Sequence, residues 1–327
     1  MIKMTFDFDR QTDRQTDRRG LISLLTAIAL LLTTILPGQF VYASDDSISF
    51  SDPVNAISET ISSNEKAGDE LVVTFGKVGI GDCIILKCGG EAAAIDGGVN
   101  KYRKKVRNIV NSMGISKFKF LVNTHSHKDH ADGLRYIVNN YECGDIFVNG
   151  LVPEKQHNRK LAGSVEKKGK SLKPLYKNDV LTLGTAIITV LGPTQYNTTK
   201  GRIGVNNNSL VLLVQHGSKR LLITGDALVQ EQNELINSDI SLSCDVLKVP
   251  HHAMKNASND RLIKASNAKY AVCSCPKYVN SSKIKKWAPF NLLAENDMKV
   301  YATGYQGDIV MVSDGEKISW NMEPLIP

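Results

Sequence analysis

Three histidines and one aspartate lie within six residues of one another, in the stretch Thr124-His-Ser-His-Lys-Asp-His130. Imidazole nitrogens and a carboxylate are ligands that suit zinc, manganese or iron. We expect His125 and His127 to converge on one ion, and Asp129 and His130 to hold a second ion nearby. Two such ions can clamp the attacking and leaving oxygens of a hydrolysis. The alternative is a solvated histidine-rich loop, although the whole chain has only seven histidines.

The residues around this stretch predict where it lies in the fold. A strand-like run, Phe118-Lys-Phe-Leu-Val-Asn123, precedes it, and a helix-like run at residues 131–138 follows it. We therefore expect the stretch on a loop at the carboxyl end of a strand, where α/β sheets usually place their chemistry.

Apolar runs and helical periodicity predict strands and helices over the rest of the chain. The expected strands cover residues 71–75, 83–88, 91–96, 145–148, 180–183, 186–193, 206–214, 220–226, 244–252, 270–273, 299–302 and 308–312. The expected helices cover residues 101–113, 131–140, 227–236, 259–266 and 281–295.

The HxHxDH pattern of residues 125–130 resembles the signature of the metallo-β-lactamase superfamily. More closely, the chain resembles the C-terminal hydrolase domain of the bacterial competence DNA-uptake channel and the secreted phosphorylcholine esterases. The resemblance runs from about residue 71 to about residue 315, and includes Ile95-Asp-Gly-Gly98 and Thr224-Gly-Asp226. It implies an αββα sandwich of two mixed β-sheets flanked by helices, within a hydrolase domain at residues 70–327.

The same resemblance implies roles for residues outside the metal loop. Asp226 would bridge the two ions, since each carboxylate oxygen can serve one ion; otherwise it would cap the helix at residues 227–236. The last ligand would be His252, with His251 in contact with the substrate or leaving group, and the reverse assignment stays open. Asp96 would orient the metal loop from behind, or else cap the helix that follows it.

One departure from the family pattern concerns the first ion. Many relatives have a third histidine for this ion before the strand pair that ends at Asp226, whereas residues 204–209 of this chain contain none. The ion would then be held by His125, His127, Asp226 and water, with Asn206 nearby. Such an open site suits manganese as well as zinc, so the predicted cofactors are two divalent ions, zinc or manganese.

A basic segment follows the metal loop. Residues 154–177 contain eight Lys or Arg and two Glu without a clear period, which predicts a long surface loop. We expect Lys167, Lys168 and Lys170 to contact a phosphodiester backbone there, or alternatively to be a solvated charged surface. No aromatic ladder accompanies them, so a stacking platform for single strands is not supported.

The N-terminus predicts export. A polar lead, an apolar run at residues 21–36 and Val41-Tyr-Ala43 indicate a signal peptide at residues 1–43, with an uncleaved anchor as the alternative. Residues 44–69 are rich in Ser, Asp, Asn and Glu and predict a flexible linker. Without residues 1–43, 35 Lys or Arg and 29 Asp or Glu remain, a net charge of about +6. The mature protein would be secreted or held at the cell surface.

The six cysteines form no CxxC or zinc-finger pattern and lie in apolar contexts. Most are expected to be buried free thiols. Export would permit disulfides, and Cys273 and Cys275 would share one face of a strand.

Together these features predict a secreted dinuclear metal-dependent hydrolase, most simply a phosphodiesterase or nuclease that uses a metal-bridging hydroxide. His251 or a metal-bound water would protonate the leaving oxygen, and Asp129 could accept a proton. The substrate would be an anionic phosphodiester, either nucleic acid or a component of the cell envelope. The alternatives are lactone, thioester or β-lactam hydrolysis at the same centre, and a non-catalytic module that binds DNA or an envelope polymer.

Overall fold

The computed structural model describes residues 69–255 and 259–327. The predicted signal peptide, and the predicted linker except for its last residue, lie outside the described residues. Within the described ranges, no helix combines the length and the apolar character that crossing a membrane requires.

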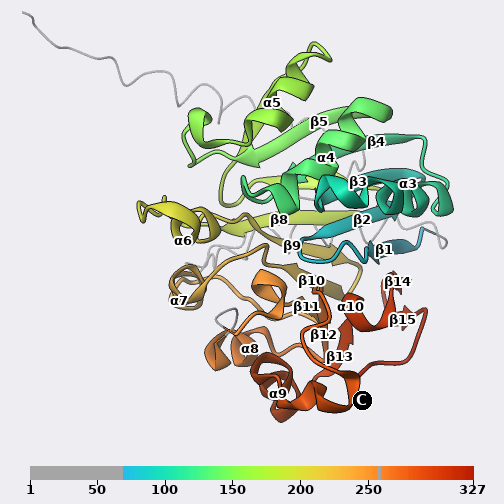
Figure 1. Cartoon of the computed structure of the whole chain (residues 1–327), viewed down its shortest axis with the longest axis vertical. Helices are drawn as coiled ribbons and strands as arrows, with labels where there is room; N and C mark the ends of the chain where they lie inside the picture. The colour runs from blue at the N-terminus through green and yellow to red at the C-terminus, as the bar shows by residue number, and fades with distance from the viewer. Residues whose placement is uncertain (1–68, 256–258) are drawn as a thin grey trace, which may run out of the picture. The chain divides into compact units, whose positions relative to one another are not determined.

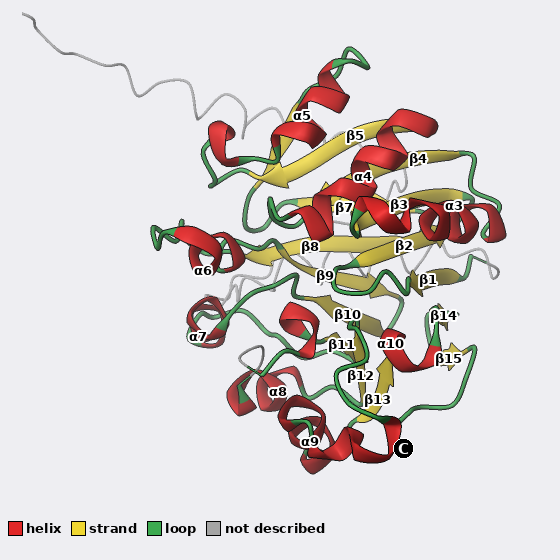
Figure 2. Cartoon of the chain, viewed as in Figure 1, coloured by secondary structure: helices red, strands yellow, loops and turns green. Residues whose placement is uncertain are grey.

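Two mixed β-sheets form the centre of the fold (Figures 1 and 2). The first has eight strands in the order β15-β14-β1-β2-β3-β4-β5-β6, and the second has seven in the order β13-β12-β11-β10-β9-β8-β7. In the first sheet β3 to β6 run parallel, and in the second β10 to β13 do. The parallel strands bring several carboxyl ends to one edge of each sheet.

The strands of the first sheet are β1 (Leu71–Phe75), β2 (Cys83–Cys88), β3 (Glu91–Gly97), β4 (Lys117–Asn123), β5 (Glu142–Asn149), β6 (Leu172–Leu175), β14 (Ile309–Ser313) and β15 (Ile318–Trp320). Those of the second are β7 (Val180–Leu183), β8 (Ala186–Gly192), β9 (Val211–His216), β10 (Lys219–Ile223), β11 (Val246–Lys248), β12 (Tyr270–Cys273) and β13 (Lys299–Ala302).

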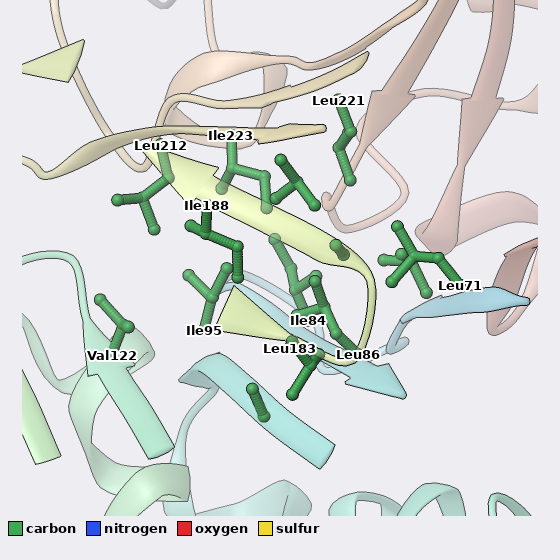
Figure 3. Close-up of a cluster of buried hydrophobic side chains, with 14 of the residues drawn as sticks. Leu71, Ile84, Leu86, Ile95, Val122, Leu183, Ile188, Leu212, Leu221 and Ile223 are labelled. Carbon is green, nitrogen blue, oxygen red and sulfur yellow. The ribbon is translucent and has the colours of Figure 1, made fainter. Parts of the chain in front are cut away.

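Apolar side chains from both sheets meet in the central core (Figure 3). Ile84 and Ile95 of the first sheet belong to the same buried cluster as Ile188, Leu212 and Ile223 of the second. All seven residues of β8 are buried, which explains its almost continuous apolar sequence.

Helices cover the outer faces of the two sheets. Those packed on the first sheet are α3 (Arg103–Ser112), α4 (Lys128–Asn140) and α5 (Arg159–Glu166). Those packed on the second are α7 (Val229–Ile236), α8 (Asp260–Ser266), α9 (Ala288–Glu295) and α10 (Thr303–Gln306). The remaining helix, α6 (Gly201–Asn206), precedes β9, and 3₁₀ turns lie at Asn100–Tyr102, Glu154–Gln156, Pro250–Ala253 and Ser281–Lys286. The predicted αββα sandwich is confirmed.

Local expectations were wrong at several places, including the end of the strand expected at residues 244–252, where Pro250–Ala253 is a 3₁₀ turn. Residues 206–210 are not strand, because α6 ends at Asn206 and the Asn208 side chain donates back to the Gly204 carbonyl (2.7 Å). The basic segment 154–177 is not one loop but contains α5 and β6; Asn158 caps α5 by accepting from two backbone N–H groups. The helix expected at residues 281–295 is a 3₁₀ turn followed by α9, with a proline in the first turn of α9.

The cysteines match their expected state. All six are buried and free. Cys275 lies beyond the end of β12 at Cys273, so the two thiols do not share one strand face as expected.

Candidate metal centre

The metal loop begins where β4 ends, and part of it is helical. His127 occupies the N-cap position of α4 and its carbonyl accepts from the His130 and Ala131 N–H groups (3.2 and 3.0 Å). Asp129 and His130 therefore lie in the first helical turn and not on a loop as predicted. A carboxylate in the first turn favours the helix, because it faces the positive end of the helix dipole.

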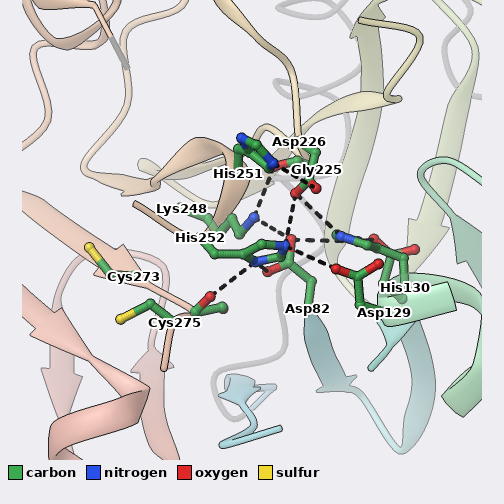
Figure 4. A network of polar contacts seen from close by, with 12 residues as sticks. Asp82, Asp129, His130, Gly225, Asp226, Lys248, His251, His252, Cys273 and Cys275 are labelled. Atoms are coloured by element: carbon green, nitrogen blue, oxygen red, sulfur yellow. Dashed lines mark hydrogen bonds and ion pairs between the residues drawn. The ribbon is translucent and has the colours of Figure 1, made fainter. Parts of the chain in front are cut away.

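The second sheet contributes the other candidate ligands. β10 and β11 are parallel, with Ile223 paired to Lys248, so the residues after each strand emerge at the same edge. Asp226 follows β10, and His251 and His252 follow β11. The structure thus brings residues separated by more than one hundred positions into one polar cluster, drawn in part in Figure 4.

One half of the cluster contains the first two histidines of the motif. His125 Nε2 and His127 Nδ1 are 3.0 Å apart, and Asp226 Oδ2 is 3.6 Å from His125 Nε2. Ligand atoms of these three residues all lie within 4.8 Å of one another. His125 is buried and His127 is half-buried.

The other half contains the fully buried His130 and His252, whereas the side chain of Asp129 is 25% exposed (Figure 4). His130 Nε2 and His252 Nε2 each lie 3.3 Å from Asp226 Oδ1, and Asp129 Oδ2 lies 3.6 Å from His252 Nε2. In a tetrahedral zinc site with ligand bonds of about 2.0 Å, neighbouring ligand atoms are about 3.3 Å apart. Each oxygen of Asp226 therefore faces its own group of histidine nitrogens at a spacing that suits an ion.

Unpaired buried atoms support metal binding by these residues. His130 Nε2, His252 Nε2 and Asp226 Oδ1 are buried and have no hydrogen-bond partner in the protein. Buried polar atoms rarely stay unpaired, because desolvation without a partner costs about 1–3 kcal/mol each. Two imidazole nitrogens and a carboxylate oxygen pointing at one spot are the donor set that a divalent ion satisfies. The residues present therefore fit the expected ions.

Asp96 fixes the position of the metal loop from behind. Its carboxylate accepts from the Asn123 side chain (3.0 Å), the Thr124 N–H (2.9 Å) and the Thr124 hydroxyl (2.5 Å). The same carboxylate is 2.7 Å from His130 Nδ1, which leaves His130 Nε2 free for an ion. Asp96 caps no helix, because its carboxylate bonds to the metal loop; the cap interpretation was wrong.

The other two buried histidines of the candidate centre, His252 and His125, also have partners at their outer nitrogens. His252 Nδ1 lies 3.1 Å from the Ser274 carbonyl, and His125 Nδ1 lies 3.1 Å from the Thr124 hydroxyl and 3.3 Å from the Ser209 hydroxyl. A histidine that donates from one nitrogen to a carbonyl presents the other as a lone pair.

Sequence reasoning missed a buried ion pair beside the centre. Lys248 is fully buried; its ammonium group pairs with Asp82 and donates to the Gly225 carbonyl (2.9 Å). Asp82 lies 3.6 Å from His252 Nδ1 and 3.9 Å from His130 Nδ1, the outer nitrogens of those rings. It therefore supports the centre from outside, although its oxygens are close enough to the ligands to suggest direct binding.

The sequence signal for Asp82 was its position after a glycine-rich turn. Gly81 has a φ of 126°, and a Cβ there would lie 2.2 Å from the Asp129 carbonyl oxygen. Only glycine allows this turn to approach the first turn of α4 so closely. The Gly-Asp pair thus places a carboxylate directly under the metal loop.

The turn with the paired histidines has an uncommon backbone. His251, His252 and Ala253 have φ values of 45°, 57° and 54°, a region that costs side-chain-bearing residues free energy. The Tyr278 hydroxyl donates to the His252 carbonyl (2.8 Å) and the Trp287 indole N–H donates to the Ala253 carbonyl (3.0 Å). These two rings stack on each other with centroids 4.6 Å apart, so they hold the turn as a unit.

His251 lies at the edge of the centre. Its Nε2 is 4.0 Å from Asp226 Oδ2 and 3.3 Å from the Asn206 side-chain nitrogen, and its side chain is 17% exposed. The groups of ligand atoms that lie within 4.8 Å of one another include His252 but neither His251 nor Asp129. Asp129 still faces the second position, because its Oδ2 is 3.6 Å from His252 Nε2. This geometry favours His252 as the ligand and leaves His251 and Asn206 facing the first ion position from outside.

The electrostatics differ between the two halves. Burial lowers the pKa of His125 well below its usual range and also lowers the pKa of His127, so both rings are neutral at pH 7. For His130, burial is outweighed by Asp226 and Asp96, which raise its pKa to about 10; similar contacts raise the pKa of His252. Metal binding to this second half must therefore displace protons.

The predicted substrate lysines do not lie at this centre. Lys168 Nζ donates to the Asn139 carbonyl (3.4 Å), and Lys170 Nζ donates to the Gly144 carbonyl (3.2 Å). Gly144 lies at the amino end of β5, about 13 Å along the strand from the residue paired with the end of β4. Lys167 is the C-cap residue of α5 and is exposed. Composition predicted a basic segment but not the end of the sheet at which it lies.

Arg202 is a cation that the sequence did not single out. It is exposed on α6 and contributes, after burial and together with other charges, to the lowered pKa of His127. Asp226 does not cap α7, whose N-cap is Leu228 without a side-chain bond, so the cap alternative was wrong.

Comparison with known proteins gives a family match. The model of the metallo-beta-lactamase superfamily matches residues 76–276, more than half of the chain. ComE operon protein 3 of Bacillus subtilis (strain 168) is 26% identical over 197 residues, which cover 60% of this chain and 25% of that protein. The uncharacterized protein YcaI of Escherichia coli (strain K12) is 34% identical over 98 residues, which cover 28% of this chain and 12% of that protein. The chain spans a quarter or less of these relatives.

Among solved structures, a putative metal-dependent hydrolase from Parabacteroides distasonis ATCC 8503 is similar to this chain. The two are 20% identical with a TM-score of 0.47, and the similarity covers 73% of this chain and 95% of the other.

Proposed function

Because the chain belongs to the metallo-β-lactamase superfamily of metal-dependent hydrolases, we propose that it is an exported, dinuclear phosphodiesterase. Two divalent ions, zinc or manganese, would supply Lewis acidity and a water of lowered pKa. The residues that would hold the first ion are His125, His127 and Asp226, and those that would hold the second are Asp129, His130, Asp226 and His252.

The observation that carries the proposal is the placement of Asp226. Its Oδ1 faces His130 and His252, and its Oδ2 faces His125. A carboxylate that is shared in this way sets two cation positions side by side, the arrangement that stabilises an in-line displacement at phosphorus. The exposed guanidinium of Arg202 adds positive charge that helps to lower the pKa of His127, and positive charge of this kind suits an anionic substrate.

The remaining polar side chains position the substrate. Burial lowers the pKa of His251, so its ring is neutral at pH 7 and serves as a hydrogen-bond partner more readily than as a charged acid. Asp129 is partly desolvated, but His252 and His130 outweigh that effect and hold its pKa below the usual range. Asp129 therefore stays an ionised ligand, and proton acceptance by it is disfavoured.

The test measures metal content and the turnover of bis-p-nitrophenyl phosphate and of a plasmid, for the full chain and for Asp129→Ala. We expect two ions per chain in the parent, and loss of the second ion and of turnover in the variant. Two bound ions without phosphodiester turnover would direct the search to lactones, thioesters and β-lactams. A chain that binds no metal would refute the centre itself.

Export is proposed on the predicted signal peptide at residues 1–43. Expression of the full chain in a bacterial host should yield an extracytoplasmic protein whose N-terminus is Ser44. A protein that keeps residues 1–43 and sediments with membranes would favour the anchored alternative.

A further inference from the structure

A pocket opens beside the first half of the metal centre. It has a volume of about 360 Å³, and His125 forms part of its wall. The other walls come from the chain that follows β5, and from the segment that leads into and through α6. A phosphodiester bound at the centre would place one of its two substituents in this pocket.

The pocket is held open by a network of side-chain amides. Asn149 donates to the Asn208 carbonyl (2.8 Å), and Asn208 donates to the carbonyls of Asn197 (2.9 Å) and Gly204 (2.7 Å). The Asn197 N–H in turn donates to the Asn208 side-chain oxygen (2.8 Å). All three asparagines are buried, so the two walls are tied to each other before any ligand arrives.

The charge of the pocket wall excludes one class of ligand. None of the described side chains that line it is acidic, whereas Lys200 is cationic and lies at its rim. A quaternary ammonium is normally held by several aromatic faces or by a carboxylate. Tyr196 is the one Phe, Tyr or Trp among the described lining residues, and its hydroxyl is bonded to Gln156 (3.0 Å). A choline group would therefore meet no aromatic cage in this pocket, and the ammonium group of Lys200 would repel it.

The size and polarity fit another class. A volume of about 360 Å³ is at the lower end of the range for small-molecule pockets and exceeds what a bare phosphate fills. Amides, hydroxyls, two imidazoles and one cation surround this space together with three valines, and so provide donors, acceptors and apolar contacts for an uncharged ring. A sugar or a nucleobase has that chemistry.

We propose that this pocket, beside His125, is the specificity subsite of the phosphodiesterase. It receives an uncharged, hydrogen-bonding ring attached to the scissile phosphate and disfavours a quaternary ammonium. The inference rests on the proposed function, because the pocket selects substrates only if the adjoining centre cleaves phosphodiesters.

The test compares p-nitrophenyl esters of thymidine 5′-phosphate, deoxyribose 5-phosphate and phosphorylcholine with the full metal-loaded chain. All three release the same phenol, so differences in kcat/KM report the other substituent. We expect kcat/KM for the thymidine ester to exceed that for the choline ester by at least about tenfold, that is about 1.4 kcal/mol. The deoxyribose ester shows which ring the pocket binds. If the pocket binds the sugar, kcat/KM for the deoxyribose ester should equal that for the thymidine ester; if it binds the base, kcat/KM for the deoxyribose ester should be lower. A choline ester cleaved as fast as the thymidine ester would overturn the inference.

Two variants at the pocket rim sharpen the test. Lys200→Glu should reduce the thymidine-to-choline ratio at least about tenfold, and Thr198→Trp should raise KM for the thymidine ester by filling the pocket. Lys104→Glu makes the same charge change on α3, away from the pocket, and should leave the ratio unchanged. A parallel response of Lys104→Glu and Lys200→Glu would attribute the effect to net charge and refute the subsite.

A binding measurement separates the two proposals. If no ester is hydrolysed, the proposed function fails, and calorimetry with thymidine 5′-phosphate and phosphorylcholine still examines the pocket. Preference for thymidine 5′-phosphate that Thr198→Trp abolishes would support the pocket as a binding site. Equal binding of the two probes would refute it.

Discussion

The two halves of the metal centre share Asp226 but are built differently. In the second half, His130 and His252 are fully buried, and their outer nitrogens contact a carboxylate and a backbone carbonyl. In the first half, His127 is half-buried and His125 has only hydroxyl groups at its outer nitrogen. A carboxylate bonded to the outer nitrogen of a histidine raises the basicity of its other nitrogen more than a hydroxyl group does. We therefore expect the second half to bind its ion more tightly, and the first half to adapt to the substrate.

Substitution of Asp226, which both halves share, should remove the expected difference in ion affinity between them. Asp226→Asn should abolish tight binding of both ions and lower kcat/KM by about 10³-fold or more, because the ions supply several kcal/mol. The measurement is metal content after gel filtration, with activity. Asp245→Asn, a partly exposed carboxylate near Lys219, is the control and should keep two ions. Retention of one ion by Asp226→Asn would show that the halves are independent.

The paired histidines should separate binding from turnover. His252→Gln should remove the second ion, whereas His251→Gln should keep both and lower kcat about ten- to one-hundredfold, the value of one or two hydrogen bonds to the substrate. Metal analysis and kinetics on both variants show which histidine binds the ion and which one acts in turnover. Loss of metal from His251→Gln but not from His252→Gln would reverse the assignment.

The outer partners test the predicted order of affinity. Asp96→Asn should weaken the second ion about ten- to one-hundredfold, and Ser209→Ala should weaken the first only a few-fold. Asn also tolerates the φ of 56° at this position, so the backbone need not change. Zinc titration against a chromogenic chelator measures both ions. Equal losses in the two variants would contradict the comparison.

A buried acid near the first half should make stability depend on pH. Burial raises the pKa of Glu231 well above its ordinary value, and outweighs the lowering effect of the Ser209 backbone. The folded chain keeps the proton that the unfolded chain loses, so stability falls as pH rises above about 4.5, by up to about 1.4 kcal/mol per pH unit. Glu231→Gln should remove this loss, and urea unfolding at pH 5 and pH 8 measures it. If Glu231→Gln increased the unfolding free energy more at pH 5 than at pH 8, the prediction would be wrong.

The smallest effect concerns the turn that carries the second half. Trp287→Phe removes the hydrogen bond to the Ala253 carbonyl and should cost about 1 kcal/mol of unfolding free energy, with weaker binding of the second ion. Trp320 stacks on Tyr301 but its indole N–H has no hydrogen-bond partner, so Trp320→Phe is a matched control that loses packing alone. Zinc affinity that falls equally in both variants would show that the bond to the turn is unimportant.

The sequence predicted the two-sheet architecture and named the residues that now lie together at the centre; their metal binding stays a prediction. The success has a physical cause, because ligands that follow buried strands emerge at a defined edge. Asp82, Lys248 and the Tyr278–Trp287 pair were not assigned these roles, since their partners come from distant segments. The positions of Lys168 and Lys170 relative to the centre could not be predicted, because charge composition indicates a surface but not its direction; their contact with a substrate stays a prediction.

The pocket was equally invisible in the sequence. Asn149, Asn197 and Asn208 form its network only after β5 and the segment before β9 have been brought together. Read singly, each asparagine indicates a turn or a helix end. Only the folded chain brings the three asparagines together as one hydrogen-bond network, and no local sequence pattern predicts that network.

The division of the candidate ligands between the two sheets would also affect the folding equilibrium. His125 and His130 follow β4 in the first sheet, while Asp226 and His252 follow strands of the second. An ion bound by both groups is lost on unfolding, so free metal becomes a reactant in that equilibrium. At a free concentration one hundred times Kd, each site would add about 2.7 kcal/mol, comparable to a modest disulfide. The melting temperature of the chain would then report the metal supply of its surroundings.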